Sequence, residues 1–538
     1  MPAFNIADLF ECVADTVPER EAVVCGDRRL TYAELDERAT RLAHALQTEL
    51  GIEPGDHVGL QLYDSCEHVE AMLACFKARA VPINVNWRYV ADELRQVLDD
   101  AGAKALFHEP EMTPVIEPSV ARGDQFEALL AKGSAMRDFP PRSGDDHYIL
   151  YTGGTTGMPK GVVWRHEDIF FAVLGGGNPA GPPIEKPAEI TKTPRTNTAL
   201  RLRAFLAPDD PGPDQFIQLS LSPLMHAGGQ WSALATLLGG GKVVLYHERH
   251  VDMATVLDLV QRERLTSLNM TGDVSAVPLL DELRANPAKY DTSSLQLLGS
   301  GASMLSGGAK SELLERIPTV VAISEAVGAS EAPVEAATVT TRSGAPPQSL
   351  KFNARPETAV LDDDFKPVAP GSGQVGRLAV RGRVPIGYHN DPEKTARTFM
   401  EVDGVRWSLP GDMATVDADG SIRLVGRGSQ CINTGGEKVY PEEVEAVVKT
   451  HPRVVDALVV GRPDPKWGQQ VVALVELNEG SELALDELDA YCRPQLAAYK
   501  LPRDVITVER IQRSPTGKPD YEWARRSVTA GTTVGEAS

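Results

Sequence analysis

Cysteine is scarce in this chain of 538 residues: it contains six, and no two of them form a C-x-x-C pair. They lie scattered at Cys12, Cys25, Cys66, Cys75, Cys431 and Cys492. Sparse, unpaired cysteines exclude a cysteine-based zinc site and a disulfide framework, and they are typical of a reduced cytosolic protein.

A long apolar run is also missing, since no stretch of about 20 uncharged apolar residues exists that could span a bilayer. The first residues, MPAFNIADLFECVADTVPER, carry acidic side chains early and have no long apolar core, so no secretory signal peptide is expected. We therefore expect a soluble, cytoplasmic protein without a transmembrane segment.

Positive charge is in deficit, because 54 Lys and Arg stand against 75 Asp and Glu, a net charge of −21. This balance argues against nucleic acid or an anionic membrane as the main partner. An anionic small-molecule ligand would have to meet a local basic site in an otherwise acidic protein.

Strands and helices alternate over residues 21–108 and 215–300, and this alternation predicts mostly parallel α/β sheets covered by helices on both faces. The capping box formed by Thr31 and Glu34 predicts the start of one of these helices. The intervening residues 175–213 are rich in Pro and Gly, so no regular structure is expected there. This segment is either a solvated loop or a mobile lid over a substrate entrance.

Three consecutive regions are expected. Residues 1–428 form a large N-terminal domain that ends in a small β-rich subdomain, predicted from the short strands and turns of 361–382 and 411–426. Residues 429–528 form a small, mobile α/β domain, and 529–538 form a tail.

The stretch YTGGTTGMPKG, from Tyr151 to Gly161, has the composition of a phosphate-binding loop. Its candidate ligand-binding residues are Thr152, Gly153, Gly154, Thr155, Thr156, Gly157 and Lys160. Glycines let the backbone approach a ligand, threonine hydroxyls donate hydrogen bonds, and lysine adds a mobile positive charge. The preceding HYILYT reads as a strand, so the loop is expected at a strand's carboxyl end, where open α/β sheets bind ligands. The alternative is a flexible Gly/Thr connection.

This loop is not the P-loop of kinases and GTPases, which places lysine directly after the last glycine. Here Met158 and Pro159 separate Gly157 from Lys160. YTGGTTGMPKGV instead resembles the phosphate-loop motif of the adenylate-forming superfamily, which includes acyl- and aryl-CoA synthetases, peptide-synthetase adenylation domains and luciferases. The resemblance implies activation of a carboxylic acid as acyl-AMP and, in most members, transfer of the acyl group to a thiol.

Further motifs match the nucleotide site of that superfamily. AVGASEAP resembles Y-G-x-T-E, which implies a catalytic, Mg²⁺-binding role for Glu331 and ATP contacts for Gly328 and Ser330. Val327 stands where an aromatic residue usually packs on adenine, so the platform here would be aliphatic. Taken alone, Glu331 would more simply be a surface residue.

Two other turns complete the implied nucleotide site. LGSGAS resembles the G-G-A-P turn that borders adenine, which implies ATP contacts for Gly301, Ala302 and Ser303. PGDMATVDADG and VGRG imply that Asp412 and Arg427 bind the ribose, and an ionised carboxylate can accept hydrogen bonds from two hydroxyls at once. The alternative is that each is an ordinary strand-to-loop turn.

The C-terminal motifs imply a mobile lysine and a CoA loop. RSPTGKPDY matches the motif of the superfamily's catalytic lysine, so Lys518 would contact ATP and the substrate carboxylate, although a surface lysine is the alternative. TGGEK resembles the loop around the pantetheine arm of CoA, which implies CoA contacts for Gly435, Gly436, Glu437 and Lys438. Ser429 and Gln430 replace the usual Lys-Asp pair of the hinge, and rotation is still expected because a hinge needs permissive dihedrals.

SPLMHAGG resembles the acyl-pocket motif and implies that His226, Gly228 and Gly229 contact the acyl substrate. The two glycines would widen the pocket for a long or bulky acid, whereas a purely structural histidine is the alternative.

The motifs occur in family order and cover almost the whole chain, which most resembles actinobacterial fatty-acyl and sterol side-chain CoA synthetases. The resemblance implies an acid–thiol ligase that uses ATP, Mg²⁺ and coenzyme A on a medium-chain, long-chain or sterol-linked acid, with no nucleic-acid partner. An acyl-AMP ligase that loads a carrier protein, an aryl-CoA ligase and a non-catalytic nucleotide-binding module are the alternatives. The oligomeric state is left open, a homodimer included.

Overall fold

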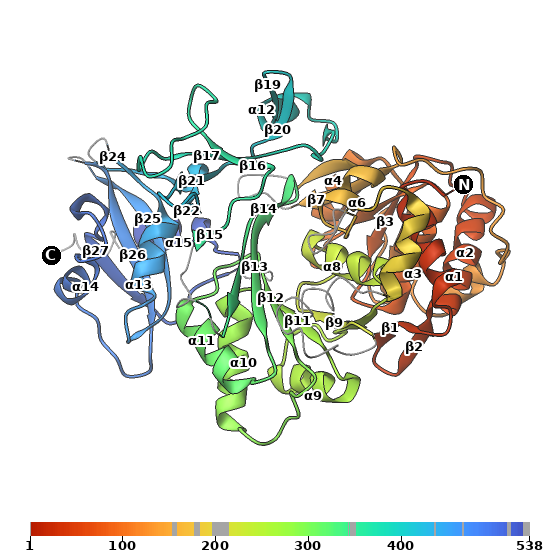
Figure 1. Ribbon diagram of the computed structural model, residues 1–538, viewed down its shortest axis with the longest axis horizontal. Coiled ribbons are helices and arrows are strands. Elements are labelled where there is room, and N and C mark those ends of the chain that lie inside the picture. Colours follow the sequence, from red (N-terminus) through yellow and green to blue (C-terminus); the bar gives the residue numbers. More distant parts are fainter. Residues whose placement is uncertain are drawn as a thin grey trace. The chain divides into compact units, whose positions relative to one another are not determined.

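The computed structural model describes residues 2–152, 159–176, 183–195, 215–342, 344, 351–434, 437–464, 467–513 and 518–530 (Figure 1). The chain divides into two units. The larger unit comprises Met1–Gly301, Leu305–Pro347 and Val380–Ser408, and the smaller comprises Ala302–Met304, Gln348–Ala379 and Leu409–Ser538. The predicted fold class is confirmed, because mostly parallel α/β sheets form a large N-terminal domain and a small α/β domain follows it. The limits at residues 428 and 429 stay a prediction.

An eight-stranded sheet forms one half of the larger unit. Its strands in spatial order are β14 (Ala332–Thr341), β13 (Ala322–Ala329), β12 (Leu297–Ser300), β11 (Ser267–Met270), β9 (Ile217–Ser220), β10 (Lys242–Leu245), β1 (Glu21–Cys25) and β2 (Arg28–Thr31). All neighbours pair in parallel except the two outermost pairs, which are antiparallel. Inner strands such as β10 (KVVL) are mostly apolar and are buried along their whole length, because a parallel sheet is covered on both faces.

A seven-stranded sheet forms the other half. Its strands in spatial order are β18 (Gly387–Tyr388), β8 (Lys160–Arg165), β7 (His147–Thr152), β4 (Val81–Asn84), β3 (His57–Gln61), β5 (Ala103–His108) and β6 (Ser119–Ala121). The strand predicted from HYILYT is therefore confirmed as β7, and it pairs in parallel with β4. On its other side β7 pairs antiparallel with β8, and β8 with β18.

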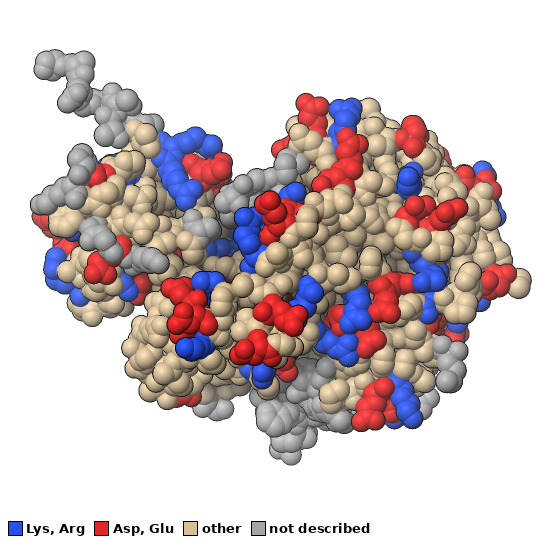
Figure 2. Space-filling model, turned by 90° about the horizontal axis from the view of Figure 1, so that it is seen from above, with Lys and Arg blue, Asp and Glu red and all other residues tan. Residues whose placement is uncertain are grey.

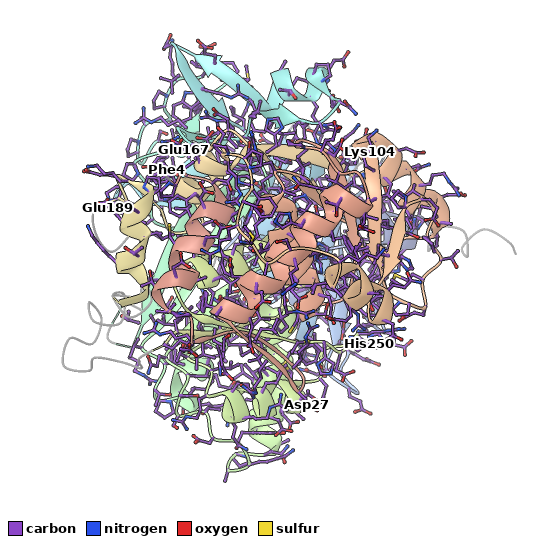
Figure 3. All side chains as sticks on the ribbon, turned by 90° about the vertical axis from the view of Figure 1, so that its right-hand side faces the viewer. Phe4, Asp27, Lys104, Glu167, Glu189 and His250 are labelled. Atoms are coloured by element: carbon purple, nitrogen blue, oxygen red, sulfur yellow. The ribbon has the colours of Figure 1, made fainter. Side chains whose placement is uncertain are left out.

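Helices cover these sheets. Those of the larger unit are α1 (Ile6–Thr16), α2 (Tyr32–Glu49), α3 (Cys66–Lys77), α4 (Ala91–Ala101), α5 (Asp124–Leu130), α6 (His166–Ala172), α8 (Ala227–Leu238), α9 (Met253–Glu263), α10 (Asp273–Ala285), α11 (Gly307–Arg316) and α12 (Pro392–Thr398). The predicted capping box is confirmed: the Thr31 side chain accepts a hydrogen bond from the backbone N–H of Glu34, and the Glu34 carboxylate accepts one from the backbone N–H of Thr31. Figure 3 faces the layer of α1, α2 and α3, and in it Phe4 is labelled beside Glu167 of α6. The ring centroid of Phe4 lies 5.8 Å from that of Phe170, which also belongs to α6.

The expectation of no regular structure over residues 175–213 is wrong in part, because Pro187–Arg195 forms a 3-10 helix. This helix packs against α1, and its Ile190 is buried in the same apolar cluster as Ile6. A contact distant in sequence thus orders a segment whose local composition predicts a loop. Residues 177–182 and 196–213 lie outside the described residues, so the loop and lid alternatives stay open there.

The smaller unit is rich in β-structure. Its strands are β15 (Lys351–Phe352), β16 (Thr358–Leu361), the first residues of β17 (Gly376–Arg381), β21 (Asp412–Val416), β22 (Ile422–Arg427), β23 (Ile432–Thr434), β24 (Glu437–Val439), β25 (Val454–Asp464), β26 (Gly468–Leu477) and β27 (Asp504–Val508). Its helices are α13 (Pro441–Val448), α14 (Leu485–Cys492) and α15 (Tyr521–Ala530), with 3-10 turns at Gly428–Gln430 and Ala498–Lys500. In the larger unit, β19 (Phe399–Val402) and β20 (Val405–Ser408) form a hairpin.

The surface carries both signs of charge. Figure 2 shows Lys and Arg interspersed with Asp and Glu on the face that it draws. Within the described part of the chain, no helix has the length and apolar character needed to cross a membrane.

Candidate active site

The carboxyl ends of four parallel strands bring several predicted residues to one edge of the larger unit. Met270 of β11 pairs with Ser300 of β12, and Ser300 pairs with Glu325 of β13, while β9 pairs with β11 on the other side. The segments after β9 and β12 and the end of β13 therefore share this edge. They carry His226, Gly301 and the residues from Val327 to Glu331. Such an edge is the usual ligand-binding position of an open α/β sheet.

The two ends of the predicted phosphate loop meet on adjacent strands. Thr152, the last residue of β7, pairs with Lys160, the first residue of β8. The Nζ atom of Lys160 lies 3.7 Å from Oδ2 of Asp391. Gly153, Gly154, Thr155, Thr156 and Gly157 lie outside the described residues. The structure thus fixes the base of the loop, and the ligand contacts of these residues stay a prediction.

Glu331 lies in the turn between β13 and β14, and side chains from other segments hold this turn. Tyr388 donates a hydrogen bond from its hydroxyl to Oε1 of Glu331 at 2.5 Å, and Ser408 donates to the Glu331 carbonyl at 2.8 Å. Trp164 of β8 donates from Nε1 to the carbonyl of Ser330 at 3.0 Å. The turn that carries the predicted metal ligand is therefore anchored on three sides.

Glycine at position 328 is required by packing. A β-carbon on Gly328 would lie 2.2 Å from the carbonyl oxygen of Pro333, on the neighbouring strand β14. Val327 pairs with Ala336 of β14 and is half-buried. The Gly in this motif thus lets β13 and β14 approach closely just before the Glu331 turn.

Hydrogen bonds hold the turn after β12 in place. Gly301 donates from its backbone to the carbonyl of Met270 at 3.3 Å, and Gly272 donates to Oγ of Ser300 at 3.1 Å. Ala302 follows with φ of +63°, in the left-handed region that non-glycine residues seldom adopt. Ala302 and Ser303 belong to the smaller unit, whereas Gly301 ends a segment of the larger one.

His226 immediately precedes α8, and the glycines occupy the first turn of that helix. His226 donates from its backbone to the carbonyl of Pro223 at 2.9 Å. A β-carbon on Gly229 would lie 2.2 Å from that same carbonyl oxygen, and one on Gly228 would lie 3.2 Å from Oγ of Ser222. The glycine at 229 is therefore needed for backbone packing, which is a different reason from a widened pocket. The acyl-binding role of these residues stays a prediction.

A buried amide that the sequence did not single out joins the phosphate loop to the His226 segment. Asn84 accepts a hydrogen bond from the backbone of Tyr151 at 2.7 Å and donates to the Tyr151 carbonyl at 2.8 Å. It also donates to the carbonyl of Met225 at 2.8 Å. The sequence feature that could have pointed to Asn84 is its place at the end of the apolar strand VPIN, because a buried amide needs hydrogen-bond partners.

A small cavity of about 10 Å³, with room for about one water molecule, lies against the same segment. It is lined by Asp64, Gln218, Ser220, Ser222, Leu224, Gly229, Ser232, Ala233, Val243, Val244 and Leu245. Oδ1 of Asp64 accepts a hydrogen bond from the backbone of Leu224 at 2.8 Å. Burial raises the pKa of the Asp64 carboxyl to about 7, from an ordinary value of 3.8. The cavity is thus lined by serine hydroxyls, an amide and a carboxyl as well as by apolar side chains.

In the smaller unit, the two predicted ribose-binding residues lie together. Asp412 opens β21 and pairs in register with Arg427, which closes β22. Nε of Arg427 lies 3.1 Å from Oδ1 of Asp412, whose side chain is buried. The backbone of Arg427 also donates to Oε1 of Glu442 at 3.1 Å. Burial, then the charges of Glu445 and Asp412, raise the pKa of Glu442 to about 8.

The other C-terminal residues are placed by the backbone. Glu437 of β24 pairs with Thr434, and Lys438 pairs with Asn433, so the two arms of the predicted CoA loop are neighbouring strands. Gly435 and Gly436 lie outside the described residues. Lys518 is exposed, and the residue after it, Pro519, forms a β-bridge with Arg513.

Comparison with known proteins supports the family assignment along nearly the whole chain. Residues 10–388 match the family profile of AMP-binding enzymes, and residues 443–518 match that of the AMP-binding enzyme C-terminal domain. The chain is 42% identical to 3-oxocholest-4-en-26-oate–CoA ligase of Rhodococcus rhodochrous, over 97% of this chain and 96% of that protein. It is also 42% identical to a medium/long-chain-fatty-acid–CoA/3-oxocholest-4-en-26-oate–CoA ligase of Mycobacterium tuberculosis, over 98% of this chain and 97% of that protein.

Solved structures share the fold over a similar extent. ATP-bound MatB from Rhodopseudomonas palustris has a TM-score of 0.80 at 26% identity, covering 97% of this chain and 99% of that one. The anthranilate CoA ligase AuaEII, solved with anthranoyl-AMP, has a TM-score of 0.78 and covers 98% of both chains. The adenylate-forming resemblance of the motifs is thereby confirmed. The chain belongs to the AMP-binding enzyme family, including its C-terminal domain.

Proposed function

We propose that this protein is an ATP-dependent acid–thiol ligase that converts a carboxylic acid into acyl-AMP, with release of pyrophosphate, and then into acyl-CoA. Relatives that share 42% identity over almost their whole length are CoA ligases, which supports this reaction over that of a non-catalytic nucleotide-binding module. The observation that carries the proposal is the common edge of the larger unit. There the base of the phosphate loop, the His226 segment and the Glu331 turn are linked by Asn84 and Trp164.

In the first step, a carboxylate oxygen of the substrate attacks the α-phosphorus of ATP, and the bond to the bridging oxygen of pyrophosphate breaks. Lys160, the hydroxyls and backbone N–H groups of the phosphate loop, and Lys518 would balance the negative charge that develops. Asp412 would accept hydrogen bonds from the ribose hydroxyls, with Arg427 beside it as a donor.

Glu331 fits a role as a magnesium ligand. Mg²⁺ is usually held by one or two carboxylates together with substrate phosphates and water. Among the described residues, no group of three or more His, Cys, Asp or Glu side chains could hold a metal ion. A single carboxylate beside the phosphate site agrees with this mode of binding. When bound there, Mg²⁺ would supply neutralisation of phosphate charge.

In the second step, the thiolate of CoA attacks the acyl carbonyl, AMP leaves, and a thioester forms. We propose that residues 429–528 rotate between the steps about the 3-10 turn at Gly428–Gln430. Rotation would withdraw Lys518 and bring the loop of Gly435, Gly436, Glu437 and Lys438 to the acyl adenylate. ATP and CoA are cytoplasmic metabolites, and we propose that the enzyme acts in the cytoplasm, as its six free cysteines suggest.

For the substrate, we propose a medium-chain, long-chain or sterol-linked acid, the substrates that the relatives' names state for those proteins. The cavity beside the His226 segment is lined in part by Gly229, one of the residues predicted to contact the acyl group.

An isotope experiment tests the adenylation chemistry directly. The acid is labelled with ¹⁸O in both carboxyl oxygens and incubated with ATP, Mg²⁺ and CoA. Direct attack on the α-phosphorus predicts that AMP carries one ¹⁸O atom and the thioester retains the other. Label in inorganic phosphate, or unlabelled AMP alongside labelled product, would refute the acyl-AMP route.

A further inference from the structure

We infer that Tyr388 is a positioning residue that holds the Glu331 carboxylate for binding of the Mg²⁺–ATP complex. This inference rests on the proposed function, since it assigns Tyr388 a part in the nucleotide site of that reaction. Tyr388 lies in IGYHNDPEKT, a segment for which no role is predicted from the sequence.

The contact itself is short and partly buried. The Tyr388 hydroxyl donates to Oε1 of Glu331 at 2.5 Å, and Tyr388 is only 8% exposed. A hydrogen bond from a hydroxyl to an ionised carboxylate has this length and is about twice as strong as a neutral one. This hydrogen bond holds Oε1 of Glu331 in place. It therefore restricts rotation of the whole carboxylate and sets the direction of its second oxygen, Oε2.

The tyrosine ring is itself held in one position. The centroid of the Tyr388 ring lies 5.5 Å from that of the Phe399 ring. Nζ of Lys394 lies over the face of the Tyr388 ring, 4.0 Å from its centroid. The backbone of Tyr388 donates to Oγ1 of Thr395 at 2.9 Å. Glycine at 387 permits this packing, because a β-carbon there would lie 2.6 Å from Cγ2 of Thr395.

The segment is also bonded to the strand that follows the phosphate loop. Gly387 and Tyr388 pair with Val163 and Val162 of β8, and His389 donates from its backbone to the Gly161 carbonyl at 2.7 Å. Because β8 begins at Lys160, Tyr388 connects the strand at the exit of the phosphate loop with the turn that carries Glu331. The two parts that would bind the phosphates and the metal are thereby kept in a fixed relation.

Partners that orient a metal ligand usually contribute measurably to metal binding. Their removal typically lowers metal affinity or activity by about 10- to 100-fold. A hydroxyl that acts only in packing would instead affect folding and ATP binding regardless of the metal. This difference separates a positioning role from a structural one.

The test is Tyr388→Phe, which removes the hydroxyl and keeps the ring. ATP affinity is measured by titration calorimetry with Mg²⁺ and with a chelator, together with the thermal unfolding midpoint. We expect the gain in ATP affinity that Mg²⁺ provides to fall about 10- to 100-fold, with the metal-free affinity and the midpoint unchanged. The matched control is Tyr290→Phe, which removes another tyrosine-to-carboxylate hydrogen bond, to Glu282, and should leave both affinities unchanged.

Two results would overturn the inference: an unchanged Mg²⁺-dependent gain, or an equal loss of affinity with and without Mg²⁺. If Tyr388→Phe lowers the midpoint, the double variant with Glu331→Gln decides the matter. If Tyr388 acts by positioning Glu331, the double variant should lose no more Mg²⁺-dependent ATP affinity than Glu331→Gln alone. A loss equal to the sum of the two single losses would contradict this role. Failure of the proposed function is a separate result, in which the unmodified protein forms no acyl-AMP from any acid.

Discussion

Glu331 and Lys518, the two side chains predicted to act in adenylation, belong to different units of the chain. The sequence predicts a role for each because each lies in a short motif whose neighbours are informative. Tyr388 and Asn84 were missed, since their contacts to Glu331 and Tyr151 join positions 57 and 67 residues apart. No local pattern reports such contacts, so residues of this kind emerge only from the fold.

Lys518→Ala should impair the first half-reaction selectively. If Lys518 stabilises charge on the α-phosphate, its loss should slow pyrophosphate release by about 100-fold or more. Thioester formation from supplied acyl-AMP and CoA should stay within about twofold of that of the unmodified protein. The two half-reactions are measured separately on the purified variant. An equal loss in both would contradict the proposed division of roles.

Gly229→Ala should destabilise the larger unit, because the added β-carbon would lie 2.2 Å from the Pro223 carbonyl oxygen. We expect the free energy of unfolding to fall by roughly 1–3 kcal/mol, measured by denaturant titration. Gly308→Ala is the matched control, since Gly308 lies exposed in α11 with no atom within 4 Å of its added β-carbon. That change should raise stability by about 0.5–1 kcal/mol. Equal effects of the two changes would mean that the close approach at Gly229 does not exist.

Among the elements, those with a strong local signal were predicted well. The helix after Thr31 and the strand before the phosphate loop are confirmed as α2 and β7. The 3-10 helix at Pro187–Arg195 was not predicted, because its order depends on Ile190 packing against α1. Elements whose stability comes from distant contacts are the ones that composition misjudges.

The start of α13 should make the smaller unit sensitive to alkaline pH. The folded-state pKa of Glu442 is about 8, well above its ordinary value of 4.5, so the folded protein holds a proton that the unfolded chain releases at lower pH. The stability that the folded protein gains by holding this proton on Glu442 is present in full below pH 4.5. It is lost as the pH rises through about 8.

Glu442→Gln should therefore stabilise the protein at pH 9, by roughly 1–3 kcal/mol, and have a smaller effect at pH 5. Thermal unfolding from pH 5 to 9 measures this difference. The control is Glu443→Gln on the same helix, whose carboxylate pairs with Nζ of Lys500 at 2.6 Å. It removes an ion pair and should bring no gain at alkaline pH. A variant profile parallel to that of the unmodified protein would show that Glu442 does not ionise in this range.

At the scale of the whole molecule, the order of the motifs from residue 151 to residue 518 predicted the fold class and the family, and both are confirmed. That order is informative because each motif supplies one requirement of a single reaction, and a chance match would not preserve the sequence of all of them. The acyl substrate could not be derived in the same way. The residues that line the cavity near His226 come from β9 and the segment after it, β10, α8 and the segment after β3, so the fold assembles them.

The measurement that tests the central claim most directly is a pyrophosphate-release screen with ATP and Mg²⁺. It covers saturated C4 to C18 acids, aromatic acids, and steroid carboxylates with and without a ring ketone, each in the presence and absence of CoA. The account predicts release that depends on the acid, a CoA thioester as product, and a preference for the long or steroid acids. Release without a thioester would indicate an acyl-AMP ligase. Absence of release across the panel would contradict the proposed reaction.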